Sequence, residues 1–99
     1  MSRDVAADAN RLKALGHPVR LGIAMALART PGTCACDFAD MFGVSQPTVS
    51  EHLRVLREAG LVTTRRRGTQ ICYSLDPAAV RKIHRALGVL DPAKVQQTA

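Results

Sequence analysis

Apolar residues in the first half of the chain recur every three or four positions, the spacing of one face of an α-helix. The segment 3–15 follows this pattern and predicts a first helix. A second segment starts with Pro18 in a first-turn position and runs to Arg29. It is apolar on nearly every side, which predicts a central buried helix. A turn at 30–33 separates it from a short helix that ends at Gly43.

The next helix has the clearest boundaries in the chain. Ser45 is suited to cap its N-terminus, and Gly60 suits the left-handed position just past its end. Val49, Leu53 and Leu56 form an apolar stripe along one side, while the opposite side is polar. The pattern therefore predicts a surface helix with one face buried and one face free to contact another molecule.

After Gly60 the apolar period changes from that of a helix to that of a strand. The runs 61–67 and 69–75 are rich in strand-forming residues and meet around Gly68, which predicts a β-hairpin. A last helix over 77–90 carries an apolar seam that a second helix could cover. The predicted order is helix, helix, helix, helix, strand, strand, helix, so the fold is mainly α with one hairpin.

Length, composition and charge narrow the class of protein. Residues 1–99 make one small domain, and a chain of this size often gains stability by pairing with a copy of itself. The hydrophobic fraction of 46% argues against disorder, and the aromatic fraction of 3% leaves little for a base-stacking platform. The formal net charge of +6 at pH 7 attracts polyanions, either nucleic acid or an anionic membrane surface.

The short helix, the turn after it and the capped helix together have the pattern of a helix-turn-helix over about 34–59. Its second helix offers short polar side chains and arginine to base edges and phosphates. The hairpin at 61–75 carries consecutive arginines beside its turn, as a DNA-binding wing does. These basic residues do not line an amphipathic helix, which disfavours a membrane-surface role. The predicted DNA-contacting residues are Gln46, Thr48, Ser50, Arg54, Arg65, Arg66 and Arg67.

No segment of the sequence predicts export, membrane insertion or catalysis. The N-terminus has no apolar signal region, and no apolar run approaches the ~18 residues that a membrane span needs. A cytoplasmic location is therefore expected, where thiols stay reduced. The chain shows neither a nucleophile paired with a base nor a glycine-rich phosphate loop, so we expect a protein that is not an enzyme.

Two of the three cysteines, Cys34 and Cys36, stand one residue apart. Thiolates are soft ligands that select thiophilic ions, and a nearby helix N-terminus favours the ionised form. On a regular helix, residues two apart point about 200° away from each other, so both reach one ion only where the chain is distorted. Because this segment leads into the helix-turn-helix, such a distortion can displace the recognition helix.

Three stretches of the sequence resemble the ArsR/SmtB group of metal-responsive repressors. They are LKALGHPVRLGIAMAL, VSQPTVSEHLRVLREAGLVTTRRRGTQICYSL and the CACD element between them, and they cover about 12–75. The resemblance implies a homodimeric winged helix-turn-helix with helices 3–15 and 77–90 at the dimer interface. It also implies a repressor that leaves double-stranded operator DNA when a metal or metalloid binds. Two recognition helices would then read half-sites about one helical turn, roughly 34 Å, apart.

The same resemblance also indicates which ions could be the inducer. Arsenite sensors of this group often carry a further cysteine at the position of Ala39, and this chain leaves Cys72 as the one remaining thiol. As(III) or Sb(III), held by three thiolates or by two and a hydroxide, is the favoured inducer. The second hypothesis for the inducer is Zn(II), Cd(II) or Pb(II), and Zn(II) and Cd(II) want about four ligands. The third hypothesis is a thiol redox or persulfide switch. His52 falls at the histidine of the S-x-H-L run, as a phosphate contact or as a packed interface residue.

Overall fold

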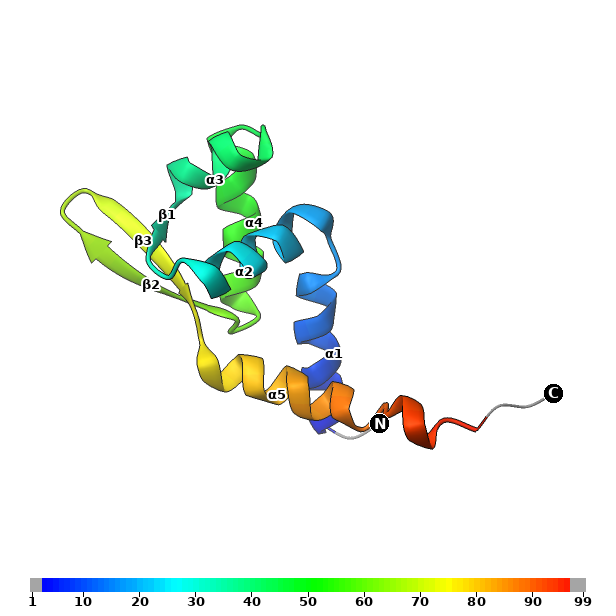
Figure 1. Cartoon of the computed structure of the whole chain (residues 1–99). Helices are drawn as coiled ribbons and strands as arrows, with labels where there is room; N and C mark the ends of the chain where they lie inside the picture. The colour runs from blue at the N-terminus through cyan, green and yellow to red at the C-terminus, as the bar shows by residue number, and fades with distance from the viewer. Residues whose placement is uncertain (1–2, 97–99) are drawn as a thin grey trace.

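The computed structural model describes residues 3–96 and has the predicted winged helix-turn-helix fold (Figure 1). Helices α2, α3 and α4 form its upper part, the hairpin projects to one side, and α1 and α5 lie together below. The elements are α1 (Arg3–Leu15), α2 (Pro18–Arg29), β1 (Thr33–Cys34), α3 (Ala35–Phe42), α4 (Gln46–Glu58), β2 (Val62–Arg67), β3 (Gln70–Leu75), α5 (Pro77–Gly88) and the 3-10 helix η1 (Pro92–Lys94).

Local chemistry accounts for the boundaries of the helix-turn-helix. Gly43 takes a φ of 63° in the left-handed region, which ends α3 and turns the chain toward α4. The Ser45 side chain accepts a hydrogen bond from the backbone N–H of Thr48, which caps α4 as predicted. Gly60, with φ of 76°, lies just past the other end. The residues at and next to its two ends therefore determine where α4 begins and ends.

The core lies where α2, α3 and α4 meet, and α2 is less buried than its composition predicts. Leu21 and Met25 on α2 are 45% and 53% exposed, because the other helices and the sheet cover only one side of it. On the covered side α2 approaches α3 so closely that a Cβ at Gly22 would lie 2.6 Å from a ring carbon of Phe42. The largest fully buried side chains are Phe38, Ile23, Leu27, Leu53, Leu56, Leu61 and Val49.

The sheet contains a strand that the sequence pattern does not predict. Besides the predicted hairpin, the two-residue strand β1 pairs antiparallel with β3, so the strand order is β1-β3-β2. Its register places Thr33 opposite Tyr73 and Cys34 opposite Cys72. Two residues are too few to show an alternating pattern, so the strand is detectable only through its distant partner. Its consequence is that the wing is joined directly to the start of α3.

Helices α1 and α5 pack together at the end of the molecule opposite the helix-turn-helix (Figure 1). Leu87, Val89 and Leu90, at the end of α5 and just beyond it, remain 45%, 79% and 70% exposed. The helix ends at Gly88, two residues before the predicted boundary. Among the described helices, none is both long enough and apolar enough to cross a membrane.

Candidate DNA-binding surface and thiol site

The outer side of α4 presents the predicted reading residues to solvent. Gln46, Thr48, Ser50 and Arg54 are all exposed, whereas the stripe that includes Leu53 faces the core. The hydroxyl of Ser45 donates to the Thr48 hydroxyl over 2.9 Å, which orients that side chain. The surface thus combines short polar groups with one arginine, as base and phosphate contacts require.

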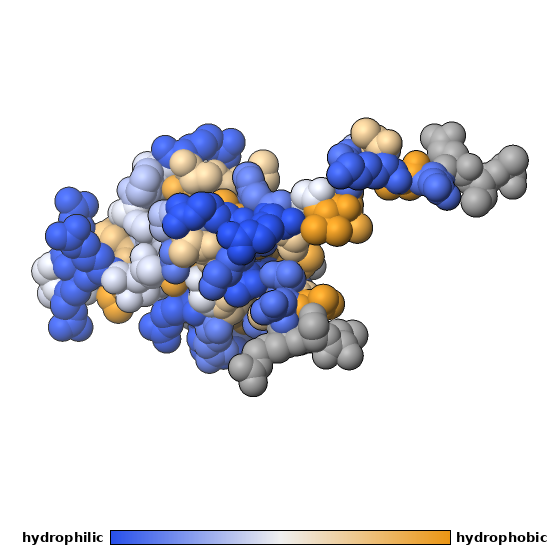
Figure 2. Space-filling model, turned by 90° about the horizontal axis from the view of Figure 1, so that it is seen from below, coloured by the Kyte–Doolittle hydropathy of each residue, from blue (hydrophilic) through white to orange (hydrophobic). Residues whose placement is uncertain are grey.

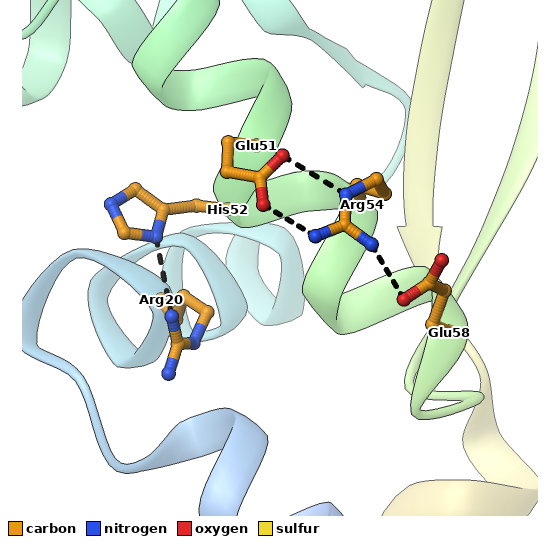
Figure 3. Close-up of polar contacts among 5 residues, drawn as sticks. All are labelled: Arg20, Glu51, His52, Arg54 and Glu58. Atoms are coloured by element: carbon orange, nitrogen blue, oxygen red, sulfur yellow. Dashed lines mark hydrogen bonds and ion pairs between the residues drawn. The ribbon is translucent and has the colours of Figure 1, made fainter.

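Arg54 is held by two carboxylates of its own helix (Figure 3). Its Nε donates to Glu51 over 2.9 Å and its Nη1 donates to Glu58 over 2.7 Å, while Nη2 also donates to Glu51. These contacts raise the pKa of Arg54, and the hydrogen bond from Arg54 lowers the pKa of Glu51. The two glutamates are absent from the predicted site, although their spacing of three and four residues from Arg54 indicates the pairing.

The hairpin carries three arginines whose positive charge no described carboxylate compensates. Arg65, Arg66 and Arg67 lie on β2 next to the turn at Gly68, and all three are exposed. No ion pair involves them within residues 3–96. Figure 2 shows hydrophilic side chains gathered at this end of the molecule. A projecting strand with three free guanidinium groups has the chemistry of a phosphate-binding wing.

Two of the three cysteines meet, and they are not the pair that is adjacent in sequence. The Sγ atoms of Cys34 and Cys72 lie 3.2 Å apart, across the β1–β3 pairing. Cys72 is 3% exposed, and Cys34 is half-buried and donates to Gln70 Oε1 over 3.3 Å. Cys36, in the first turn of α3, instead has its Sγ 4.0 Å from a carboxylate oxygen of Asp37.

An open hollow of about 500 Å³ is lined in part by Cys72, the buried member of this thiol pair. It lies between the wing and the turn before β1, and its walls combine guanidinium groups with a thiol. No group of three or more His, Cys, Asp or Glu side chains is assembled for a metal ion in the described part of the chain. The residues lining the hollow are Pro31, Gly32, Arg65, Arg66, Arg67, Cys72 and Ser74.

The pairing changes the acidity of Cys34, the more exposed of the two thiols. The hydrogen bond with Cys72, followed by desolvation, raises the pKa of the Cys34 thiol to about 11. Since only the thiolate is nucleophilic, alkylation of Cys34 by iodoacetamide is expected to accelerate between pH 9 and about 11. Cys72→Ala should lower the midpoint of that rise. Peptide mass spectrometry measures both rates, and a wild-type midpoint below 9 would contradict the pairing.

His52 faces the body of the protein rather than the reading surface. Its ring lies 4.4 Å from that of His17, centroid to centroid, and its Nδ1 is 3.4 Å from Nη1 of Arg20 (Figure 3). Desolvation, then the charges of His17 and Arg20, lower the pKa of His52. His17 also accepts a hydrogen bond from Val19 N–H at the start of α2. These contacts favour the interpretation of His52 as a residue packed between helices, because they join α4 to α2.

Known proteins share this sequence and fold. The family model described as "Bacterial regulatory protein, arsR family" matches residues 17–64. The biofilm growth-associated repressor of Xylella fastidiosa (strain 9a5c) is 39% identical over 89 residues, which are 90% of this chain and 77% of that protein. The arsenical resistance operon repressor of Escherichia coli (strain K12) is 40% identical over 65 residues, 66% of this chain and 56% of that protein.

A solved structure extends the likeness to almost the whole chain. It is the homodimeric winged helix-turn-helix DNA-binding domain of a Mycobacterium bovis protein described as a possible ArsR-family transcriptional regulator. It superposes with a TM-score of 0.72 at 27% identity and covers 100% of this chain and 94% of that one.

Proposed function

Because this chain belongs to the ArsR family of bacterial transcriptional repressors, we propose that it releases its operator DNA when trivalent arsenic or antimony binds to Cys34 and Cys72. The observation that carries this proposal is the 3.2 Å separation of the two Sγ atoms. Two thiols at that distance present their lone pairs to one soft centre, and thiophilic ions are those that thiolates select. An arsenical resistance repressor is also among the relatives of the chain.

The raised pKa of Cys34 supports a metalloid over a divalent cation. In arsenous acid, arsenic carries hydroxyl groups, and each thiol proton leaves with one hydroxyl as water when an As–S bond forms. A divalent cation must instead displace the proton that the raised pKa of Cys34 retains at neutral pH. Zn(II) and Cd(II) also want about four ligands. Two neighbouring thiols therefore suit As(III) or Sb(III) better.

An ion bound to Cys34 and Cys72 can displace the DNA-binding surface in two ways. Cys34 is the residue that precedes the first turn of α3, and it makes no side-chain capping bond there. Cys72 belongs to β3, which carries the wing through its pairing with β2. A bound ion would tie these elements together, and recruitment of Cys36 as a third ligand would unwind the first turn of α3. Either change displaces α4 or the wing relative to DNA.

We also propose that the working unit is a homodimer that meets through α1 and α5. Leu87, Val89 and Leu90 have exposed apolar side chains at and just beyond the end of α5. Figure 2 shows apolar side chains where the C-terminal segment leaves the body. Covering such residues removes apolar area from water. The homodimeric state of the related Mycobacterium bovis domain supports pairing of two copies of this chain. Pairing would present two copies of α4 to successive half-sites of an operator.

The ion assignment is tested by release of a fluorescent duplex that the protein selects from a randomised pool. Arsenite and antimonite are expected to halve the anisotropy change at concentrations roughly tenfold or more below those of zinc, cadmium or lead, a difference of about 1.4 kcal/mol or more. The physical reason is that two thiols match a trivalent centre, whereas Zn(II) and Cd(II) want about four ligands. Release by cadmium or zinc at lower concentration than arsenite would overturn the assignment.

The geometry also favours a second candidate, a thiol redox switch at the same pair. Residues directly opposite on antiparallel strands bring their sulfur atoms within reach of a disulfide. A hydroperoxide would take two electrons and two protons from Cys34 and Cys72, yielding the disulfide, water and an alcohol. Release of DNA by hydroperoxide but not by arsenite would assign this function in place of metalloid sensing.

A further inference from the structure

The outer side of α4 carries a carboxylate in the half of the helix that enters DNA. Four exposed residues lie along this side, spaced three, one and three positions apart: Pro47, Ser50, Glu51 and Arg54. In helix-turn-helix proteins the N-terminal half of the second helix contacts base edges in the major groove. We propose that Glu51 reads one cytosine in each half-site by accepting a hydrogen bond from its N4 amino group. This inference rests on the proposed DNA-binding function of α4.

Glu51 is held in one orientation before any DNA arrives. Nε and Nη2 of Arg54 donate to its two carboxylate oxygens, which is the paired geometry that arginine and carboxylate groups favour (Figure 3). Arg54 in turn is held from its other side by Glu58 over 2.7 Å. The carboxylate therefore loses little rotational freedom on binding, and Arg54 is its positioning residue. The pKa of Glu51 is lowered by that arginine, so the group is ionised at neutral pH.

An ionised carboxylate has only acceptors to offer, and this restricts what it can bind on DNA. Phosphate oxygens repel it. In the major groove the hydrogen-bond donors are the N4 amino group of cytosine and the N6 amino group of adenine. Adenine presents its N7 acceptor next to N6, which suits a side chain with both a donor and an acceptor, such as glutamine. Cytosine is therefore the base that matches Glu51.

The charges on this surface agree with a role for Glu51 in recognising a base. An exposed glutamate on a DNA-facing helix would oppose binding unless its charge were compensated. Here Arg54 pairs with both Glu51 and Glu58, so this cluster keeps one net negative charge, and affinity for the phosphates is supplied by Arg65, Arg66 and Arg67 on the wing. Glu51 is thus free to contribute base selectivity.

The test compares the duplexes that wild type, Glu51→Gln and Glu51→Ala select from one randomised pool. Wild type is expected to select a cytosine at one position of each half-site. Glu51→Gln should change that base to adenine, and Glu51→Ala should accept any base there, with all other positions unchanged. The matched control is Glu58→Gln, which also removes a carboxylate from Arg54 but lies about two turns further along α4. It should retain the cytosine.

Affinity measurements on the selected duplex complete the test. Replacing the cytosine pair by a thymine pair should weaken wild-type binding roughly tenfold to a hundredfold and leave Glu51→Ala unaffected. If Glu51→Ala keeps the wild-type base preference at every position, Glu51 reads no base, although the DNA-binding function stands. If wild type selects no duplex from the pool, the proposed function fails and the inference fails with it.

Discussion

Serine in place of Cys34 is expected to leave operator affinity unchanged and to abolish release by arsenite. The reason is that Cys34 and Cys72 form the one thiol pair in contact within the described chain, while the residues predicted to contact DNA lie on other elements. Cys34 is half-buried, so a serine hydroxyl is tolerated at its position. Titration of the wild-type and variant complexes with arsenite, followed by anisotropy, measures both properties.

Two further variants separate the contributions of the other thiols. Cys72→Ala should lose the response as completely as Cys34→Ser, and alanine avoids leaving a hydroxyl without a partner at a position that is 3% exposed. Cys36→Ser should still respond, at an arsenite concentration raised roughly tenfold if Cys36 supplies a third ligand worth about 1.4 kcal/mol. Full release from a protein that lacks both Cys34 and Cys72 would remove the proposed site.

Glutamine at all three wing arginines is expected to reduce DNA affinity on the order of a hundredfold or more at low salt. Arg65, Arg66 and Arg67 have no ion-pair partner among the described residues, so their charge is available to phosphates. Each lost phosphate contact should also make the plot of log affinity against log salt shallower by about 0.9. The measurement is a set of binding isotherms at several salt concentrations.

A control for net charge uses the exposed basic residues Arg81 and Lys94, which lie on α5 and η1 away from the reading surface (Figure 1). Arg81→Gln combined with Lys94→Gln should change the affinity only slightly and leave the salt slope as in wild type. A wing variant that keeps the wild-type slope would show that the hairpin does not follow the DNA backbone.

The helix-turn-helix and the wing could be predicted from the sequence because their signals are local. The cap at Ser45 and the glycines at 43 and 60 determine where α4 begins and ends. The change of apolar period after Gly60 identifies the strands, and the run of arginines beside Gly68 identifies the charged tip. Each of these features depends on residues within a few positions of one another, so the structure that they predict does not depend on the rest of the chain.

The composition of the thiol site depended on contacts between distant parts of the chain. The sequence places Cys34 beside Cys36, yet β1 pairs with β3 and sets Cys34 against Cys72, which is 38 residues away. Strand register decides which side chains face each other, and a strand of two residues carries no periodic signal of it. The exposed side of α2 was likewise undetectable, since Leu21 is apolar whether or not another element covers it.

By itself, therefore, the sequence determined the five α-helices, the hairpin and their order, and it predicts that α4 and the wing contact DNA. Short-range hydrogen bonding and apolar spacing suffice for those properties. The pairing of Arg54 with Glu51 and Glu58 follows from their spacing along one helix. Only the tertiary structure decided which two cysteines meet and that His52 packs toward α2. These depend on register, rotamer and packing, which the order of residues along the chain does not express.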